Sequence, residues 1–327
     1  MRTFVANMKI EKLLISNFKS ILHLELSGFK RINLLIGRPN VGKSNIIEAL
    51  SIFTIPQYKQ SGFKKITDLI RVENESELFF EGNIEKPIII STDMLNGGIS
   101  FQKQEGLQIV LNNRLFKCNE KLEISNGRGE AENYGINRYI FSPQASLKKG
   151  FGHFLAPPFG SNLLAMIELF PKLRQELQDL FKEYQLQLIF DKASQSLKIM
   201  KQRENEVFLL PYHSVADTLQ RVIFFKTAIV SNENNVLLLE EPEAHAFPPY
   251  ISQITQEIIH SQHNQFFITT HSPFIVNDLL ENAIEDLAIF MVDYQNQQTI
   301  VNTLTSEEIR EIYRYGIDLF TNYETYL

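Results

Sequence analysis

The amino-acid sequence predicts an α/β protein in which a parallel sheet carries a phosphate-binding loop. Three observations predict it: an apolar run at residues 32–36 leads into a glycine-rich loop and a helical pattern, and VLLLE at 236–240 and QFFITT at 265–270 are almost continuously apolar. Buried parallel strands have such uninterrupted apolar runs. Each run ends in polar residues, which we expect to lie beside one another.

The composition restricts the class of protein. The chain has 327 residues, of which 44% are hydrophobic and 21% charged, which is typical of a soluble globular protein with one large or two joined domains. A net charge of −6 argues against a generally basic nucleic-acid coat, although a local basic groove stays open. Cys118 is the only cysteine, and no apolar run approaches the roughly 20 residues that span a bilayer. We therefore expect a cytoplasmic protein without a membrane partner.

The loop GRPNVGKSN at residues 37–45 fits the pattern G-x-x-x-x-G-K-[ST]. Its glycines let backbone amides point inward around a phosphate, Lys43 supplies a charge for the β- and γ-phosphates, and Ser44 binds magnesium. A glycine turn with a surface lysine is the alternative, which the flanking strand and the helix expected at 45–53 disfavour. The predicted nucleotide-binding residues of the loop are Gly37, Asn40, Gly42, Lys43, Ser44 and Asn45.

The segments before and after this loop predict a single domain, 1–327, with three parts. Strand-like runs at 9–18 and 22–29, and then at 77–84, 86–92, 98–102 and 107–113, indicate a mostly antiparallel β lobe within 1–140. A strand at 139–144 and the Gly/Pro-rich stretch 150–160 mark the start of an inserted helical and meander region, 141–213.

The inserted region has a helical stripe, Leu173, Leu177, Leu180, Phe181 and Tyr184, preceded by Pro171, and then three short strands. The last part, 214–327, starts with an apolar helix around 218–230. It ends in a hairpin (AIFMVDY and TIVNTL) and a helix over SEEIREIYRYGIDLF.

The wording of the loop alone resembles the phosphate loop of small ribosome-assembly GTPases. Such GTPases need an N-K-x-D-like segment that reads guanine and a D-x-x-G switch, and neither string occurs in the sequence. The resemblance to these GTPases therefore fails.

Two adjacent carboxylates, Glu240 and Glu241, follow the apolar strand in VLLLEEPEAHAFP. This is the pattern of a Walker B element, in which one carboxylate orients Mg²⁺ and the next polarises the attacking water. Neighbouring residues on a strand point to opposite sides, so we expect the strand to separate the two roles. Two surface glutamates are the alternative.

His271 follows the strand in QFFITTHSP, 30 residues after Glu241. An imidazole at this place can hydrogen-bond the γ-phosphate and the attacking water. A purely structural histidine is the alternative.

These motifs together resemble an ABC-type ATPase of the SMC/RecF branch, closest to the ATPase module of the OLD (overcoming lysogenization defect) family. The resemblance implies a P-loop NTPase fold with an ABC/SMC-like head, ATP and Mg²⁺ as cofactors, and Lys43, Glu241 and His271 as catalytic residues. Glu240 stands where many ABC proteins have Asp. Gln144 matches the Q-loop glutamine that senses magnesium, or is a capping or surface glutamine.

The signature segment is represented by HSVADTLQR, where Ser214 precedes a helix but Val215 and Ala216 replace the family's glycines. The resemblance assigns Ser214 to the ATP of a second subunit, against a plain helix N-cap. It implies a homodimer or higher homo-oligomer that closes on ATP and reopens on hydrolysis.

The expected function is an ATPase that switches a separately encoded effector, a nuclease or toxin, in bacterial antiphage defence or a DNA-related process. A built-in Toprim nuclease is not expected, because no D-x-D string occurs and only 56 residues follow His271. His260 and His263 could suggest a metal site, but the single cysteine and the lack of a nearby H-E-x-x-H string favour a solvated helix face.

DNA binding is possible through basic residues that otherwise serve solvation: Lys64, Lys65, Lys148, Lys149, Lys198, Lys201 and Arg203. The alternatives are a non-hydrolysing ATP-gated scaffold or toxin inhibitor, a RecF-like DNA repair ATPase, and a transporter subunit, which the missing LSGGQ signature disfavours.

Overall fold

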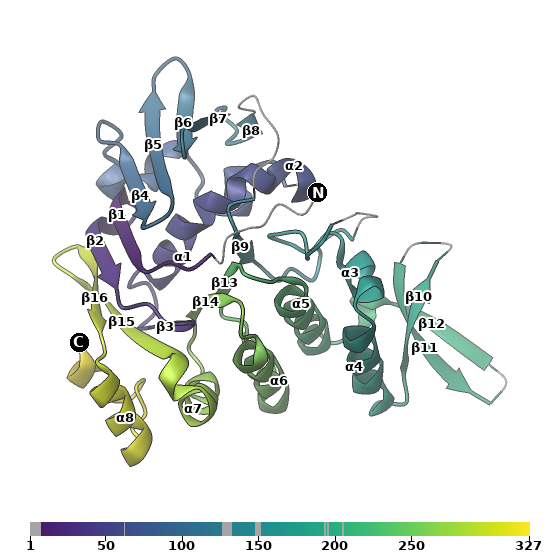
Figure 1. Ribbon diagram of the computed structural model, residues 1–327. Coiled ribbons are helices and arrows are strands. Elements are labelled where there is room, and N and C mark those ends of the chain that lie inside the picture. The colour runs from purple at the N-terminus through teal and green to yellow at the C-terminus, as the bar shows by residue number, and fades with distance from the viewer. Residues whose placement is uncertain are drawn as a thin grey trace.

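A computed structural model describes residues 8–61, 63–125, 133–147, 152–192, 194, 196–204 and 206–327. Two large sheets, of seven and six strands, lie on either side of a helix (Figure 1). Further helices cover the outer face of the six-stranded sheet, and a three-stranded sheet lies at one end of the molecule. Within these residues, no helix has both the length and the apolar character to cross a bilayer.

The central sheet has six strands in the order β16-β15-β3-β14-β13-β9. The strands are β3 (Ile32–Ile36), β9 (Ile136–Tyr139), β13 (Val236–Glu240), β14 (Gln265–Thr269), β15 (Leu287–Gln295) and β16 (Gln298–Thr303). All are parallel except β16, which pairs with β15 as an antiparallel edge. The expected parallel strands are confirmed, and the carboxyl ends of β3, β13 and β14 lie at one edge of the sheet.

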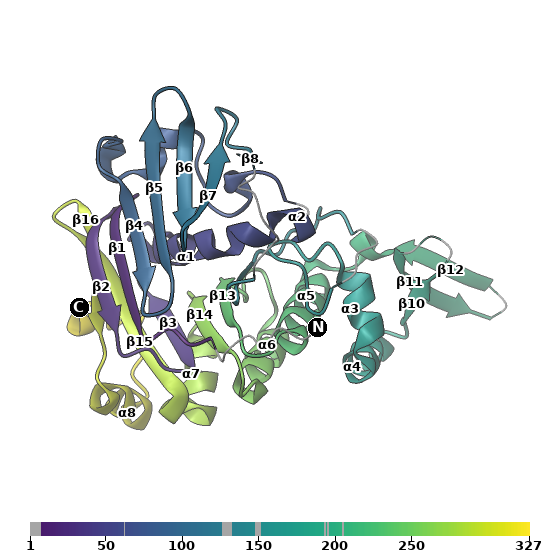
Figure 2. The same cartoon turned by 45° about the horizontal axis from the view of Figure 1, so that its top comes forward.

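Both faces of the central sheet are covered, which explains why β3, β13 and β14 are mostly apolar. Ile32, Leu34 and Ile36 belong to one core and Leu35 to the other, as alternation along β3 requires. The first core packs against α5 (Asp217–Ser231), α6 (Pro248–His260) and α7 (Pro273–Asn282). The second core packs against α1 (Lys43–Ser51), which lies between the two large sheets (Figure 2).

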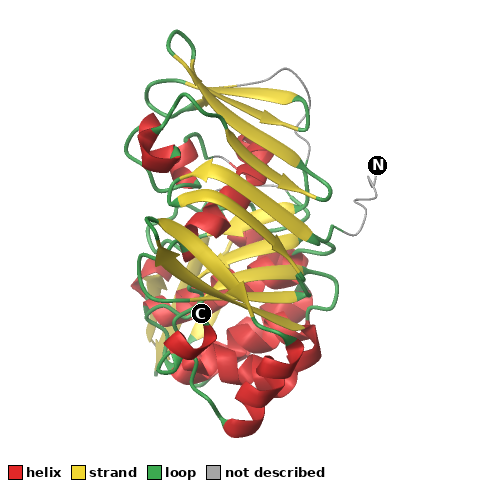
Figure 3. Ribbon diagram, turned by 90° about the vertical axis from the view of Figure 1, so that its left-hand side faces the viewer, coloured by secondary structure: helices red, strands yellow, loops and turns green. Residues whose placement is uncertain are grey.

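The other large sheet is antiparallel and forms the expected β lobe, stacked on the central sheet (Figure 3). Its order is β2-β1-β4-β5-β6-β7-β8. The strands are β1 (Lys12–Phe18), β2 (Ile21–Ser27), β4 (Ile88–Thr92), β5 (Asn96–Gln102), β6 (Gly106–Leu111), β7 (Arg114–Cys118) and β8 (Ile124–Ser125).

The helical and meander region is also confirmed. It comprises α3 (Leu163–Leu169), α4 (Pro171–Lys182), β10 (Gln187–Asp191), β11 (Ser196–Arg203) and β12 (Glu206–Pro211). Pro171 occupies the first turn of α4, where its missing N–H has no intrahelical partner to lose. The predicted stripe is buried as far as Phe181, whereas Tyr184 lies beyond the helix and is 48% exposed.

The C-terminal hairpin and helix are β15, β16 and α8 (Ser306–Tyr315). Thr305 caps α8 by accepting from the Glu308 amide, and Gly316 ends it in a left-handed conformation at φ 61°. Short helical segments complete the chain: η1 (Ile52–Gln57), α2 (Tyr58–Ser61), η2 (Ile66–Asp68), η5 (Tyr212–Ser214), η6 (Ile284–Asp286) and η7 (Tyr323–Tyr326).

Two strand predictions are wrong. Residues 77–84 form parts of two 3₁₀ helices, η3 (Glu75–Leu78) and η4 (Phe80–Gly82), because the Asn74 side chain caps the first and Glu81 takes a left-handed φ of 52°. The strand expected at 139–144 is β9, which ends at Tyr139, since Ser142 accepts from the Ala145 amide in a turn. The division at 140 and 213 stays a prediction.

Candidate functional site

The phosphate loop connects β3 to α1, and its two glycines are required by packing. A Cβ on Gly37 would lie 2.2 Å from the Val292 carbonyl oxygen of β15. Gly42 has a φ of 103°, and a Cβ there would lie 2.0 Å from Oγ1 of Thr299 on β16. The loop is thus pressed against β15 and β16, which leaves room only for glycine at both positions.

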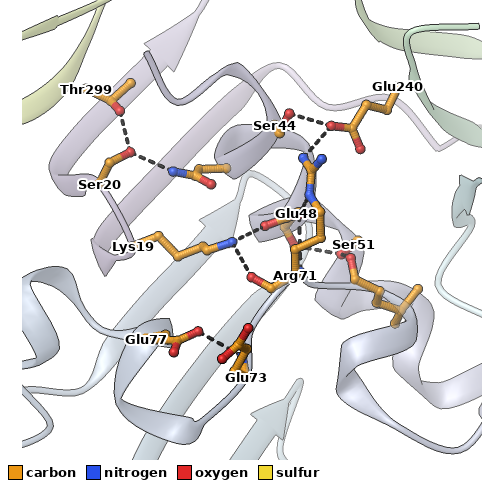
Figure 4. Close-up of polar contacts among 12 residues, drawn as sticks. Lys19, Ser20, Ser44, Glu48, Ser51, Arg71, Glu73, Glu77, Glu240 and Thr299 are labelled. Carbon is orange, nitrogen blue, oxygen red and sulfur yellow. Dashed lines mark hydrogen bonds and ion pairs between the residues drawn. The ribbon is translucent and has the colours of Figure 1, made fainter. Parts of the chain in front are cut away.

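Hydrogen bonds between polar side chains also hold the loop on the side that faces β16. Thr299 Oγ1 donates to the Val41 carbonyl at 2.9 Å and lies 2.6 Å from Ser20 Oγ, and Asn45 Nδ2 donates to Ser20 Oγ at 2.6 Å. Ser20 and Thr299 come from opposite ends of the sequence (Figure 4). Asn45, predicted as a nucleotide-binding residue, thus contacts these side chains, and Asn40 adopts a left-handed φ of 62° in the exposed part of the loop.

Lys43 opens α1 and is folded back over the loop. Its Nζ donates to the Gly37 carbonyl at 2.8 Å and to the Arg38 carbonyl at 2.7 Å, and the residue is 5% exposed. Burial lowers the pKa of Lys43 to about 8, although the charges of Glu241 and Glu240 oppose the shift. Both predicted Walker B carboxylates are therefore close to this ammonium group.

Ser44 and Glu240 are in direct contact, since the Ser44 hydroxyl donates to Oε1 of Glu240 (Figure 4). Burial alone would raise the pKa of Glu240, but the charge of Arg138, the Ser44 hydrogen bond and the charge of Arg71 together lower it. Glu240 is thus held ionised. A hydroxyl and a carboxylate are oxygen donors of the kind Mg²⁺ prefers, so this pair fits the predicted metal.

Two arginines that no sequence motif indicates neutralise Glu240. Arg138 of β9 donates to Oε2 at 2.6 Å, and Arg71 donates to Oε1 at 2.6 Å. Arg71 also contacts Glu48 of α1 at 3.0 Å, and Lys19 pairs with Glu48 at 2.6 Å (Figure 4). Glu240, Arg138, Arg71, Glu48 and Lys19 thus form one network of paired charges.

The sequence offers one signal for this network. Glu48 and Arg138 are charged residues within apolar runs of a helix and a strand, and both are almost fully buried. Charges are rarely buried unless paired, so their positions indicate partners but not which partners.

Glu241 and His271 lie side by side, with His271 Nε2 3.5 Å from Glu241 Oε1. Burial, followed by the positive charge of Lys43, lowers the pKa of His271, whereas Glu241 opposes the shift. The imidazole is therefore neutral near pH 7. The structure thus brings Lys43, Glu241 and His271 to one place at the carboxyl edge of the sheet.

Glu240 and Glu241 are separated by a turn and not by strand alternation as expected. β13 ends at Glu240, and Glu241 has a left-handed φ of 41° while its amide donates to the Thr269 carbonyl at 3.0 Å. The turn directs one carboxylate to Ser44 and the next to His271.

The remaining predicted site residues lie elsewhere. Ser214 is exposed at the end of η5 and is not the N-cap of α5, which is Ala216. It lines a largely apolar cavity of about 460 Å³ together with Tyr184 and Phe247. Gln144 is exposed in the turn after β9.

The basic residues proposed for DNA binding come from three separate parts of the sequence. Lys64, Lys65, Lys201 and Arg203 are exposed, Lys198 pairs with Asp191 at 2.5 Å, and Lys148 and Lys149 lie outside the described residues. Among the residues that the structure describes, no group of three or more His, Cys, Asp or Glu side chains is arranged to hold a metal ion.

Over residues 32–277, the sequence matches the protein family described as "AAA domain, putative AbiEii toxin, Type IV TA system". A search of curated proteins finds no match. Among solved structures, the chain is similar to an SMC head bound to the C-winged helix domain of ScpA, at 16% identity and a TM-score of 0.52, covering 92% of this chain and 99% of that one. A second similar structure is the SMC head domain from Thermotoga maritima, at 13% identity and a TM-score of 0.43, covering 91% and 100%. The first likeness confirms the predicted fold of a P-loop NTPase with an SMC-like head.

Proposed function

Because the chain belongs to this AAA-domain family, we propose that it binds and hydrolyses ATP as an ABC-type ATPase with Mg²⁺. The observation that carries the proposal is the placement of the Glu241 carboxylate beside the His271 imidazole, within reach of the Lys43 charge. Phosphoryl transfer to water uses a group that positions the attacking water and a cation that offsets charge on the phosphates, and Glu241 and Lys43 are suited to these two roles.

Each side chain has a defined task in this proposal. On binding ATP, Lys43 would exchange the Gly37 and Arg38 carbonyls for phosphate oxygens, and Ser44 and Glu240 would hold Mg²⁺. When bound, Mg²⁺ neutralises charge on the β- and γ-phosphates. Glu241 orients a water molecule and accepts its proton as the water oxygen attacks the γ-phosphorus. The bond from the γ-phosphorus to the β–γ bridging oxygen breaks, which gives ADP and phosphate.

The test compares ATP turnover in Lys43→Ala with that in Lys182→Ala, a surface lysine paired with Asp179. We expect turnover to fall to background in the first variant and to stay unchanged in the second. Turnover that persists in Lys43→Ala contradicts the proposed site.

We further propose that the enzyme is a dimer, or a larger homo-oligomer, in which Ser214 of one copy faces the ATP of the other, as the resemblance to the OLD family implies. The exposure of Ser214 supports this role, because a contact in trans needs an accessible residue.

A separately encoded effector, a nuclease or toxin, is the proposed target of the ATP switch, in antiphage defence. The family description, which names a putative toxin, and the SMC head bound to a domain of ScpA support a protein partner. Co-purification with the products of neighbouring genes, with and without ATP, tests this. DNA remains a second partner to test, by duplex retention on filters at low salt.

One observation favours a second candidate, an ATP-gated scaffold or toxin inhibitor that does not hydrolyse ATP. Val215 and Ala216 replace the glycines before α5, so a second subunit's backbone has less room to approach the phosphate. ATP binding that Lys43→Ala removes, without measurable turnover in the unaltered chain, favours this candidate over the first.

A further inference from the structure

Glu243 lies in the turn after β13, two residues beyond Glu241, and its side chain connects this turn to the end of β14. Its Oε1 accepts from the Thr270 hydroxyl at 2.7 Å and from the His271 backbone amide at 2.8 Å. Glu243 is 8% exposed and Thr270 is fully buried. The contact is therefore an internal tie between the segment that carries Glu241 and the segment that carries His271.

The tie holds the backbone on both sides of His271. The Thr270 hydroxyl, while donating to Glu243, accepts from the Ser272 amide at 3.0 Å. Glu243 thus binds the Thr270 hydroxyl and the His271 amide directly, and it holds the Ser272 amide through the Thr270 hydroxyl. The orientation of the imidazole depends on this backbone, since its side chain is about a third exposed and is less constrained by packing.

We propose that Glu243 is a positioning residue of the ATPase site, which holds the His271 imidazole beside the Glu241 carboxylate without touching ATP or Mg²⁺. This inference rests on the proposed hydrolysis of ATP and names a further residue on which that reaction depends. Glu241 and Glu243 share one turn, so the tie sets the distance between base and imidazole and not merely the stability of the edge.

The acceptor at Oε1, and not the negative charge, is the feature the tie needs. The second oxygen, Oε2, is buried and has no hydrogen-bond partner among the described residues, and burial raises the pKa of Glu243. Glutamine keeps the Oε1 acceptor and replaces only the unpartnered oxygen. Glu243→Gln should therefore preserve the tie, whereas Glu243→Ala removes it.

The experiment measures kcat and KM for ATP in the unaltered chain, Glu243→Ala, Glu243→Gln, His271→Ala and the double variant. We expect Glu243→Ala to lower kcat about tenfold with KM changed less than about threefold, and Glu243→Gln to keep roughly half of kcat or more. In the His271→Ala background, Glu243→Ala should cost less than about twofold, because the two residues act through one imidazole.

Asp278→Ala is the matched control. Asp278 also ties the two chain segments that follow β13 and β14, since it accepts from Ser252 at 3.1 Å and Gln256 at 3.0 Å between α6 and α7. The Asp278→Ala variant should have a changed melting temperature but an unchanged kcat. If Glu243→Ala does not fold, Thr270→Val takes its place. This variant keeps the shape of the side chain but removes the hydroxyl that donates to Glu243 and accepts from the Ser272 amide. Its effect on kcat should likewise be smaller in the His271→Ala background.

Additive losses in the double variant, or a Glu243→Gln variant as slow as Glu243→Ala, overturn the inference while leaving ATP hydrolysis in place. Turnover that Lys43→Ala does not affect overturns the proposed function, and this inference with it.

Discussion

The Ser44 hydroxyl donates a hydrogen bond to the Glu240 carboxylate across 196 positions of the chain. Ser44 lies in the first turn of α1 and Glu240 is the last residue of β13, so the contact joins the phosphate loop to the Walker B strand. Arg138 of β9 and Arg71, in the segment between η2 and η3, hold the same carboxylate. The predicted metal-binding pair is therefore positioned by side chains from several distant parts of the chain.

The two arginines should contribute unequally to stability. Arg138 has a side chain that is 2% exposed, so Arg138→Met leaves Glu48 and Glu240 without their buried partner and should cost about 3 to 5 kcal/mol of unfolding free energy. Arg71 is 66% exposed, and Arg71→Met should cost about 1 kcal/mol or less. Urea unfolding of both variants measures the difference, and equal losses contradict the assignment of Arg138 as the main counter-charge.

The steric demand on Gly42 can be separated from its backbone strain. Gly42 and Gly28 both have left-handed φ values, 103° and 79°, but a Cβ on Gly28 meets nothing within 4 Å. Gly28→Ala should cost about 1 kcal/mol of stability and leave ATP affinity unchanged. Gly42→Ala should weaken ATP binding by more than about tenfold, because Thr299 displaces the loop. Calorimetric titration with ATP distinguishes the two, and equal affinities show that the loop tolerates the side chain.

ATP affinity should fall as the pH rises above about 8. Burial lowers the pKa of Lys43 in the free chain to about 8, so Lys43 is charged below this pH and neutral above it. The phosphates bind the charged form, so the dissociation constant should rise by up to about tenfold per pH unit above pH 8. The measurement is binding of a non-hydrolysable ATP analogue between pH 6.5 and 9.5.

Lys43→Arg is the control for this pH dependence, because a guanidinium stays charged over the whole range. The affinity of Lys43→Arg should not fall above pH 8. A pH dependence retained in Lys43→Arg assigns the titration to another group.

The sequence predicts the strands that position the candidate site, because parallel strands have a simple signature. β3, β13 and β14 are mostly apolar and end at one edge of the sheet, so the polar residues that follow them are brought close together. Short apolar runs carry less information. The segment 77–84 has strand-like composition, but the Asn74 cap and the left-handed Glu81 make it two 3₁₀ helices.

Contacts between distant charged residues could not be predicted in the same way. Arg71 and Arg138 lie 169 and 102 residues from Glu240, and no motif links them. Likewise, Glu243 follows the acidic pair like any residue of a polar turn, and only the folded chain shows its side chain under His271. A sequence pattern identifies groups that act on the ligand more readily than groups that hold them.

The most direct measurement of the central claim is ATP turnover and molecular mass in ATP for Glu241→Gln. The amide keeps the shape of the side chain but cannot accept the proton of the attacking water, so turnover should fall by at least about a hundredfold. Light scattering should then show a stable ATP-dependent dimer, whereas the unaltered chain returns to its starting mass as ATP is consumed. Turnover in Glu241→Gln equal to that of the unaltered chain contradicts the claim that Glu241 is the base.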